Sequence, residues 1–517
     1  MSFAGIQLDA QAELPLYRQL HRQIRERILR GALAAGDRLP ATRDLAQQLE
    51  LNRATVSSAY ALLEEDGLIH GHVGRGSFVA DQAERPSLGS PMPAPGGLGF
   101  VSQSGFVPQS GFVPQAGNPS GDVGFVSQNG AAPATAEISF ATSRPHAGLF
   151  PLDQFRRSCE EVLATEVAHT VLQLGSPLGY APLRQYLLEE AEERQIGRAN
   201  DDILITNGCQ QAIDLLARAV LDPEATVLVE EPVYPGLKSA LAQAKVRFVG
   251  MPVGPHGVSP EEFARFVEGE RPRMAVLTPS FQNPTGAVIR ADARRAILET
   301  ARRAGVLLVE NDLYSALQYR GETVPAIKSF EGADDVVLLG SFSKVAFPGL
   351  RVGWVIAPRA LIRRLAGIKQ ATDLHTDQLS QAVLLRFAES GRLDDHLRHV
   401  RTVGLTQLEA AIEGCRRYLP PGTQFTTPDG GLNLWVQLPA PLDAGALLNA
   451  AQARGVSYLP ARYFAVNRLE PGAFRLSFGG LTPPEIERGL GLLGEVFDEE
   501  LARGIRSGAV EMETAMV

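Results

Sequence analysis

Seven short apolar runs between residues 200 and 360 restrict the fold more than any other feature of this sequence. Each has the length of a strand, and segments with the apolar spacing of amphipathic helices separate them. The runs are Ile203–Thr206, Val227–Glu230, Val246–Gly250, Met274–Leu277, Val306–Glu310, Val336–Gly340 and Val352–Ile356. Continuous apolar runs that alternate with helices predict a mostly parallel seven-stranded sheet with helices on both faces.

Polar motifs follow five of these predicted strands directly. In open α/β sheets, ligands bind beyond the carboxyl ends of the strands, so the motifs predict a ligand site at that edge. They are Thr206-Asn207-Gly208-Cys209-Gln210, residues 231–236, residues 279–286, Asn311-Asp312-Leu313-Tyr314 and Ser341-Phe342-Ser343-Lys344.

Lys344 is the residue of this set with the most specific chemistry. The chain has 44 arginines and only five lysines, and a lysine amine can form an imine with an aldehyde whereas a guanidinium cannot. Taken alone, Lys344 also fits a surface lysine that follows a strand. The neighbouring motifs favour a catalytic lysine.

The motifs together fit the chemistry of pyridoxal 5'-phosphate. This cofactor needs a lysine for its aldehyde, here Lys344, and a carboxylate that keeps its pyridine nitrogen protonated, here Asp312. Its phosphate needs hydroxyls, backbone N–H groups and a cation. The other predicted ligands are Asn283 and Tyr314 for the ring oxygen, Tyr234 for stacking, and Gly208, Cys209, Gln210, Ser341, Ser343 and Arg351 for the phosphate.

The first eighty residues predict a small separate domain. They hold nine arginines and nine acidic residues, whereas the whole chain has a net charge of −9. Apolar spacing predicts a helix, a second short helix with Thr42 as its N-cap, a third helix after Asn52, and a hairpin of two strands. This order is that of a winged helix-turn-helix. A small helical domain that contacts only proteins is the alternative.

This head resembles the GntR family of bacterial regulators. The resemblance rests on G-D-R-L-P-A-T-R-D-L-A at 36–46, N-R-A-T-V-S-S-A-Y-A-L-L at 52–63 and G-R-G-S-F-V at 74–79. It implies that the head binds DNA. The residues expected to contact DNA are Arg43, Arg53, Thr55, Arg75 and Gly76.

A low-complexity segment separates this head from the rest. Asp122 is the only charged residue between Pro86 and Ala136, and Gly-Phe-Val occurs four times. So little apolar surface cannot offset the entropy that the segment would lose on becoming ordered, so we expect a flexible tether. The alternative is that the Phe-Val pairs dock weakly on a neighbouring surface. The expected domains are 1–82, the linker 83–136, a large domain 137–360 and a smaller α/β domain 361–517.

The body resembles fold type I aminotransferases over about residues 140–500, in the branch that contains 2-aminoadipate and kynurenine aminotransferases. The resemblance implies the cofactor roles given above, Arg475 as the ligand of a substrate α-carboxylate, and a homodimer with the site at its interface. The whole chain resembles the MocR class of regulators. It keeps Asn283, which many of these regulators lack, and it has Leu174 where related enzymes often place a tyrosine that reaches the phosphate of the neighbouring subunit.

The sequence therefore predicts a transcriptional regulator that binds operator DNA and senses an amino compound carrying a carboxylate. The alternatives are a working aminotransferase with an attached DNA-binding domain, and a scaffold in which both parts have lost their activity. No apolar run is long enough to span a membrane and the first residues lack the pattern of a signal peptide, so we expect a cytoplasmic protein. The three isolated cysteines predict neither disulfides nor a metal site.

Overall fold

The computed structural model describes two compact units separately. The first unit comprises Met1–Phe106 and the second comprises Val107–Val517. The described residues are 16–29, 36–49, 51–65, 68–72 and 76–79 with Leu8 and Leu33, here called the head, and 137–515, here called the body. The predicted linker 83–136 lies outside the described residues.

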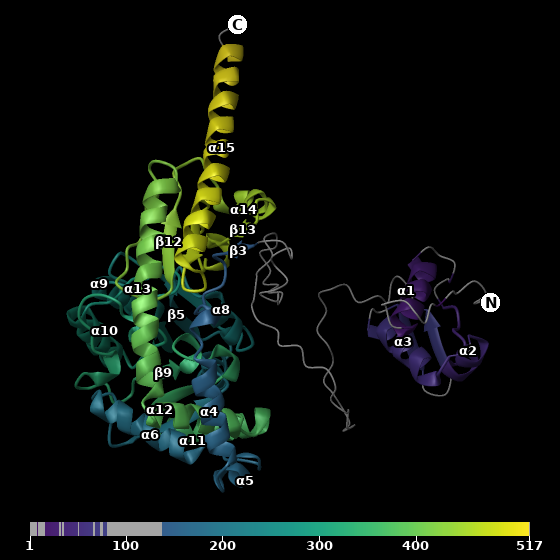
Figure 1. Cartoon of the computed structure of the whole chain (residues 1–517), viewed down its shortest axis with the longest axis horizontal. Helices are drawn as coiled ribbons and strands as arrows, with labels where there is room; N and C mark the ends of the chain where they lie inside the picture. Colours follow the sequence, from purple (N-terminus) through teal and green to yellow (C-terminus); the bar gives the residue numbers. More distant parts are fainter. Residues whose placement is uncertain are drawn as a thin grey trace. The chain divides into compact units, whose positions relative to one another are not determined.

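The head has the predicted order of elements. Its helices are α1 (Leu16–Leu29), α2 (Thr42–Gln48) and α3 (Arg53–Glu65), and its antiparallel hairpin consists of β1 (Ile69–His72) and β2 (Gly76–Val79). The core includes Leu20, Ile24, Val56 and Leu63. The expected winged helix-turn-helix is confirmed, and it is the unit coloured purple in Figure 1.

One detail of the head differs from the prediction. Thr42 was expected to cap α2, but α2 begins at Thr42 and its N-cap is Ala41, which has an extended backbone and makes no side-chain cap bond. The N–H groups of Asp44 and Leu45 bond instead to the carbonyl oxygen of Ala41. Because Thr42 is already helical, its hydroxyl is not in the N-cap position.

The body contains the predicted seven-stranded sheet, and each predicted run forms one strand. The order is β4-β10-β9-β8-β7-β5-β6, and only β10 runs antiparallel to its neighbours. The strands are β4 (Asp201–Thr206), β5 (Thr226–Glu231), β6 (Arg247–Pro252), β7 (Met274–Leu277), β8 (Leu307–Asn311), β9 (Val337–Ser341) and β10 (Gly353–Pro358).

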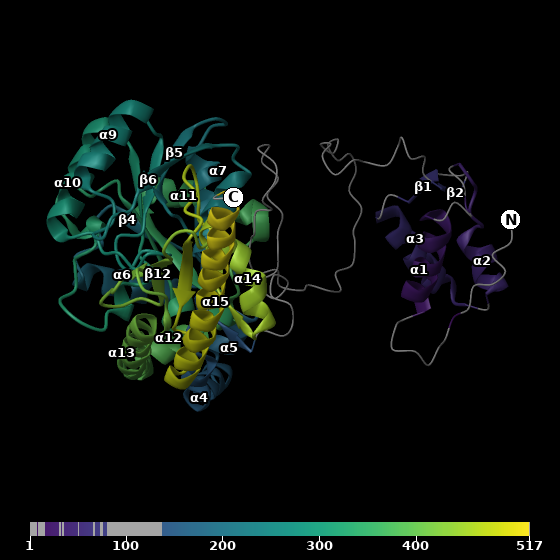
Figure 2. The ribbon, with the colours of Figure 1, turned by 90° about the horizontal axis from the view of Figure 1, so that it is seen from above.

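Helices cover both faces of this sheet (Figure 1, Figure 2). On β9, Val337 and Leu339 face one apolar core and Leu338 faces another, as the two-residue period of a strand requires. The helices α7 (Cys209–Val220), α8 (Pro235–Ala242) and α11 (Arg359–Asp373) pack on the first face. The opposite face packs against α6 (Ala181–Glu193), α9 (Pro260–Glu270), α10 (Ala291–Ala304) and α12 (Gln378–Glu389).

A second sheet lies in the C-terminal part of the body. It is antiparallel with the order β11-β12-β15-β14, and a separate parallel pair joins β13 to β3. The strands are β3 (Ile138–Ser139), β11 (Gln424–Phe425), β12 (Asn433–Gln437), β13 (Val456–Ser457), β14 (Leu459–Pro460) and β15 (Ala473–Ser477). The remaining helices are α4 (Leu152–Leu163), α5 (Val167–Val171), α13 (Arg392–Tyr418), α14 (Ala444–Ala453) and α15 (Pro483–Ala515).

Packing contacts cross the predicted boundary at residue 360. Helix α11 buries Ile362 and Leu365 against the large sheet, and α12 buries Phe387 there. Conversely, Ile138 and Phe140 belong to the apolar core of the C-terminal part. The chain at β3 therefore packs with the C-terminal part of the body. Among the described helices, none combines the length and the apolar composition needed to cross a membrane.

Candidate active site and DNA-binding head

Lys344 lies at the carboxyl edge of the large sheet, as predicted. It ends the 3-10 turn η4 (Phe342–Lys344), which follows β9 directly. Its Nζ donates to the carbonyl oxygen of Ser143 at 2.6 Å and lies 5.9 Å from the ring centroid of Tyr314. Burial lowers the pKa of Lys344 to about 8, and the charges of Arg475 and Arg351 act in the same direction. A neutral, nucleophilic amine is therefore accessible near neutral pH.

Asp312 lies on the neighbouring strand end with a carboxylate that is only 8% exposed. Its Oδ2 is 3.6 Å from Nη2 of Arg194, which sequence reasoning did not single out among so many arginines. Its Oδ1 is buried and has no hydrogen-bond partner among the described residues. Since a buried acceptor without a donor is costly, this oxygen fits a ligand that brings an N–H, as a protonated pyridine does.

Asn283, Tyr314 and Arg475 form one buried, hydrogen-bonded cluster. Asn283 donates from Nδ2 to Tyr314 Oη at 3.2 Å and accepts from Arg475 Nη1 at 3.0 Å. Arg475 Nη2 donates to the carbonyl oxygen of Ala141, and its Nε has no acceptor among the described residues. Burial lowers the pKa of Arg475 to about 10 and raises the pKa of Tyr314. A buried guanidinium with an unused N–H fits a carboxylate ligand.

Tyr234 lies at the end of β5, where it is the N-cap residue of α8. The residue is 37% exposed, and its ring packs on Gly236, where a Cβ would lie 2.3 Å from Cε1 of the ring. Glycine at 236 therefore keeps the ring against the backbone. Such a ring, held at the same edge as Lys344, is available for stacking.

A candidate phosphate cradle lies between β4 and α7. Gly208 has φ 80° and leads into α7, which begins at Cys209, so the N–H groups of the first helical turn are available to an anion. Arg351 donates from Nη1 to Ser343 Oγ and from Nη2 to the carbonyl oxygen of Asn207, both at 3.3 Å. A Cβ at Gly208 would lie 2.5 Å from Arg351 Nη2. The positive φ therefore favours glycine at this position, and a side chain there would also displace the guanidinium of Arg351.

Three predicted phosphate ligands have side chains engaged elsewhere. The Ser341 hydroxyl accepts the Ser343 N–H at 3.1 Å as the cap of η4, and it lies 3.2 Å from the carbonyl oxygen of Val352. The Cys209 thiol points to the carbonyl oxygen of Gly340, and burial raises its pKa to about 12. Gln210 donates to the carbonyl oxygen of Gly236. In Cys209 and Gln210, the groups that fit a phosphate are therefore the backbone N–H groups and not the side chains.

Two further site contacts come from backbone atoms. The carbonyl oxygens of Ala141 and Ser143 accept hydrogen bonds from Arg475 and Lys344. They belong to the chain between β3 and α4, which the C-terminal core holds in place through Phe140. Because any residue type supplies a carbonyl oxygen, no side-chain motif could have indicated these contacts.

Glu231 is a further residue that sequence reasoning did not single out. Its Oε1 accepts the N–H groups of three successive residues, Val466, Asn467 and Arg468, at 2.9, 2.7 and 2.6 Å. This carboxylate ties a loop of the C-terminal part to the end of β5. The same loop follows Phe464, whose ring lies 5.1 Å from the guanidinium of Arg475. The only signal in the sequence was the position of Glu231 at a strand end.

The predicted DNA-contacting residues of the head are described to different extents. Arg43 is exposed on α2, and Thr55 is half-buried in the first turn of α3. Arg53 begins α3 and Gly76 begins β2, but the side chain of Arg53 is outside the described part of the chain. Arg75 lies outside the described residues.

Comparison with known proteins identifies both parts of the chain. The sequence pattern of the family "Aminotransferase class I and II" matches residues 146–493, which is more than half of the chain. The chain belongs to the class I and II aminotransferase family. Residues 16–79 match "Bacterial regulatory proteins, gntR family", so this member of the family has a GntR-type DNA-binding head.

The chain is similar over nearly its entire length to a protein that is named as a regulator. The probable rhizopine catabolism regulatory protein MocR of Rhizobium meliloti is 29% identical over 95% of this chain and 95% of its own length. The resemblance to the MocR class therefore extends over nearly the entire chain.

Solved structures of aminotransferases match the body of the chain. Kynurenine aminotransferase of Pyrococcus horikoshii, in complex with PMP, is 32% identical over 71% of this chain and 92% of that chain, with a TM-score of 0.69. The α-aminoadipate aminotransferase of Thermus thermophilus, complexed with N-(5'-phosphopyridoxyl)-L-leucine, is 32% identical over 71% of this chain and 93% of that chain, with a TM-score of 0.67.

The cofactor of this family is pyridoxal 5'-phosphate, and the donors of the body fit it. The unpartnered Oδ1 of Asp312 suits a pyridine N–H, the low pKa of Lys344 suits an amine that reacts with an aldehyde, and the turn at Gly208 suits a phosphate. When bound, this cofactor supplies an electron sink for an amino group attached to it.

Proposed function

We propose that this protein is a pyridoxal phosphate-dependent transcriptional regulator whose body recognises an amino compound with an α-carboxylate. The observation that carries the proposal is the buried guanidinium of Arg475 beside Lys344, whose Nε–H has no acceptor among the described residues, in a chain that has a GntR-type head. Binding of the amino compound favours one state of the body and thereby changes the affinity of the head for operator DNA.

The residues take the following proposed roles. Lys344 presents a neutral amine to the aldehyde carbon, and its pKa of about 8 keeps part of it unprotonated. Asp312 holds the proton of the pyridine nitrogen. Arg475 binds the α-carboxylate of the amino compound. The supporting ligands are Asn283 and Tyr314 for the ring oxygen, Tyr234 for the ring face, and Ser343, Arg351 and the N–H groups after Gly208 for the phosphate.

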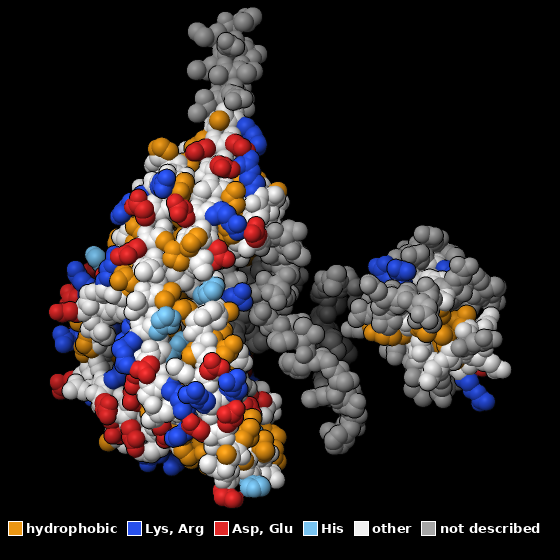
Figure 3. Space-filling model, viewed as in Figure 1, with side chains coloured by type: hydrophobic (Ala, Val, Ile, Leu, Met, Phe, Trp, Pro, Cys, Tyr) orange, Lys and Arg blue, Asp and Glu red, His pale blue; other side chains and the backbone are white. Residues whose placement is uncertain are grey.

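We also propose that the body forms a homodimer through the surface around Leu174. Leu172, Leu174 and Leu374 are 68%, 79% and 54% exposed. Gln378 donates to the carbonyl oxygen of Gln173 at 2.9 Å, which holds the loop of Leu172 and Leu174 beside the start of α12. Figure 3 shows hydrophobic side chains at the end of the body where α5 lies. Exposed apolar side chains in one region fit an isologous interface.

A dimer of this kind carries two heads, so we propose a repeated or palindromic operator. Because operator DNA is the partner of the head, the proposed place of action is the cytoplasm. Sedimentation equilibrium measures the state of assembly, and Leu174→Arg is expected to shift the body toward monomer. A wild-type body that stays monomeric at micromolar concentration would contradict the dimer.

A second candidate function is amino transfer from an amino acid to a 2-oxo acid. It is favoured by the hydrogen bonds that join Asn283 to Tyr314 and Arg475. These bonds hold in place the three side chains that an amino-transfer site needs for the cofactor and the substrate carboxylate. In this case Lys344 would be the base that takes up and returns the proton at the α-carbon of the substrate.

One experiment tests both candidates. Purified protein is loaded with pyridoxal phosphate and mixed with a panel of amino acids, with and without operator DNA, while the cofactor absorbance and the operator affinity are recorded. A sensor shows an absorbance change together with a change in operator affinity and no product. An aminotransferase releases a 2-oxo acid. A protein that stays colourless with added pyridoxal phosphate would refute the proposal.

A further inference from the structure

A buried ion pair on α11 lies directly behind the candidate phosphate cradle. Lys369 is fully buried, and its Nζ donates to the two carboxylate oxygens of Asp373 at 2.8 and 2.9 Å and to Gln211 Oε1 at 2.9 Å. The side chain of Asp373 is 24% exposed. None of the roles proposed above uses these three residues.

The network around this ion pair ends on Asn207, the residue between β4 and Gly208. Asn207 donates from Nδ2 to Asp373 Oδ2 at 2.7 Å and from its backbone N–H to Gln211 Oε1 at 2.8 Å. Gln211 in turn donates to Asp373 Oδ2 at 2.6 Å. The carbonyl oxygen of Asn207 accepts from Arg351 Nη2 at 3.3 Å. Asn207 is thus held at its N–H, its carbonyl and its side-chain amide.

These contacts fix the direction in which the chain enters the glycine turn. Gly208 follows Asn207 at once, and α7 begins at the next residue. A rotation of Asn207 would therefore move both the first N–H groups of α7 and the acceptor that holds Arg351. A buried ion pair is often no more stabilising than apolar side chains of similar volume. Stability alone therefore does not account for Lys369 and Asp373, whereas the orientation of Asn207 does.

We propose that Asp373 and Lys369 are positioning residues for the cofactor phosphate, acting through Asn207. The inference rests on the proposed function, because it assigns the phosphate to the turn at Gly208. It predicts that the network raises the affinity for ligands that carry the phosphate. The reaction of Lys344 with an aldehyde is expected not to depend on the network.

The test compares two aldehydes, pyridoxal phosphate and pyridoxal, which lacks the phosphate. Their dissociation constants are measured by absorbance for the wild-type chain, Asn207→Ala and Asp373→Asn, and the bound phosphate is followed by phosphorus NMR. The affinity for pyridoxal phosphate is expected to fall about tenfold, the scale of one charge-assisted hydrogen bond. The affinity for pyridoxal is expected to stay unchanged, and the phosphorus signal is expected to shift.

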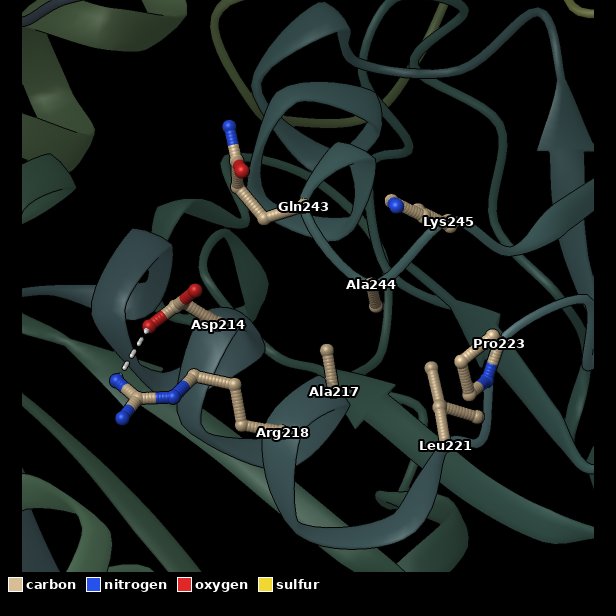
Figure 4. A pocket seen from close by; sticks show the side chains of 8 residues that line it. All are labelled: Asp214, Ala217, Arg218, Leu221, Pro223, Gln243, Ala244 and Lys245. Atoms are coloured by element: carbon tan, nitrogen blue, oxygen red, sulfur yellow. Dashed lines mark ion pairs between the residues drawn. The ribbon is translucent and has the colours of Figure 1, made fainter. Parts of the chain in front are cut away.

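Thr372→Ala is the matched control. Arg218 Nη1 donates to Thr372 Oγ1 at 2.8 Å, so this bond also joins α7 to α11 without touching Asn207. Figure 4 shows Arg218 and its ion pair with Asp214 beside a depression of about 290 Å³ on the outer side of α7. Thr372→Ala is expected to leave both affinities and the phosphorus signal as they are.

The possible results separate cleanly. Equal losses for both aldehydes, or no loss in either variant, would overturn the inference. If Asp373→Asn does not fold, Asn207→Ala decides, because it leaves the pair of Lys369 and Asp373 intact. A wild-type protein that binds neither aldehyde would instead refute the proposed function, and the inference with it.

Discussion

Replacement of Arg475 gives the sharpest test of the proposed ligand class. Arg475 is buried, donates to Asn283 and Ala141, and keeps Nε unused. Arg475→Lys retains the positive charge but replaces a planar fork with a single ammonium. The loss of a charge-assisted hydrogen bond to a carboxylate costs about 1.5–3 kcal/mol, which corresponds to a roughly tenfold to hundredfold weaker affinity for the amino acid.

The assay uses a pair of ligands that differ only in the carboxylate. Holo-protein is titrated with the amino acid that gives the largest absorbance change, and with the amine that remains when its carboxylate is removed. The wild-type chain is expected to prefer the amino acid, and Arg475→Lys is expected to lose this preference while its affinity for the amine is unchanged. Arg468→Lys, at a side chain that is 75% exposed, is the matched control.

Stability needs a separate measurement. Arg475→Met leaves the acceptors on Asn283 and Ala141 without a donor, at about 1–3 kcal/mol each in the free energy of unfolding. The lysine variant is therefore used for binding, and its cofactor spectrum must match that of the wild-type protein. An equal loss of affinity for the amino acid and the amine, or no loss for either, would refute the assignment of Arg475 to the carboxylate.

Four further predictions follow from other residues. Lys344→Ala is expected to abolish the visible absorbance of the bound cofactor; persistence of that absorbance would exclude Lys344 as its attachment point. Burial raises the pKa of Glu230 to about 8, so the folded chain holds a proton that the unfolded chain releases, and the free energy of unfolding falls as the pH rises toward 8. Glu230→Gln is expected to flatten this decline in urea midpoints measured from about pH 5 to about pH 8, and an unchanged slope would contradict the raised pKa. Glu231→Gln weakens three hydrogen bonds and is expected to lower stability by about 1–3 kcal/mol, with faster amide exchange in the loop that it binds and not in the large sheet. Arg43→Ala is expected to weaken operator binding about tenfold, and Gln47→Ala, exposed on the same helix, is expected to leave it unchanged; equal effects would place the DNA surface elsewhere.

Several site residues were predictable because their chemistry is tied to a strand end. Asp312 and Lys344 follow β8 and β9 directly, and parallel strands bring their carboxyl ends to one edge of the sheet. Ser341 shows what this reasoning does not include. Residue type and position predict a phosphate ligand, but they do not predict that its hydroxyl also accepts the Ser343 N–H as the cap of η4. The cap bond depends on turn geometry, which the residue types do not specify.

Long-range contacts were beyond sequence reasoning for a different reason. Lys369 and Asp373 on α11, and Arg194 directly after α6, resemble ordinary surface charges until the helices are packed. Ala141 and Ser143 contribute through carbonyl oxygens, which every residue type possesses. Only their positions in the folded chain distinguish these side chains and carbonyl oxygens from others of the same type.

The sequence by itself determined the strand runs, the head and the chemical identity of the site, because apolar period and residue type are local properties of the chain. The tertiary structure decided which oxygens and N–H groups remain without a partner once the chain has packed. That property depends on every neighbour of an atom, and among the described residues Asp312 Oδ1 and Arg475 Nε are two of the buried atoms that it leaves without a partner.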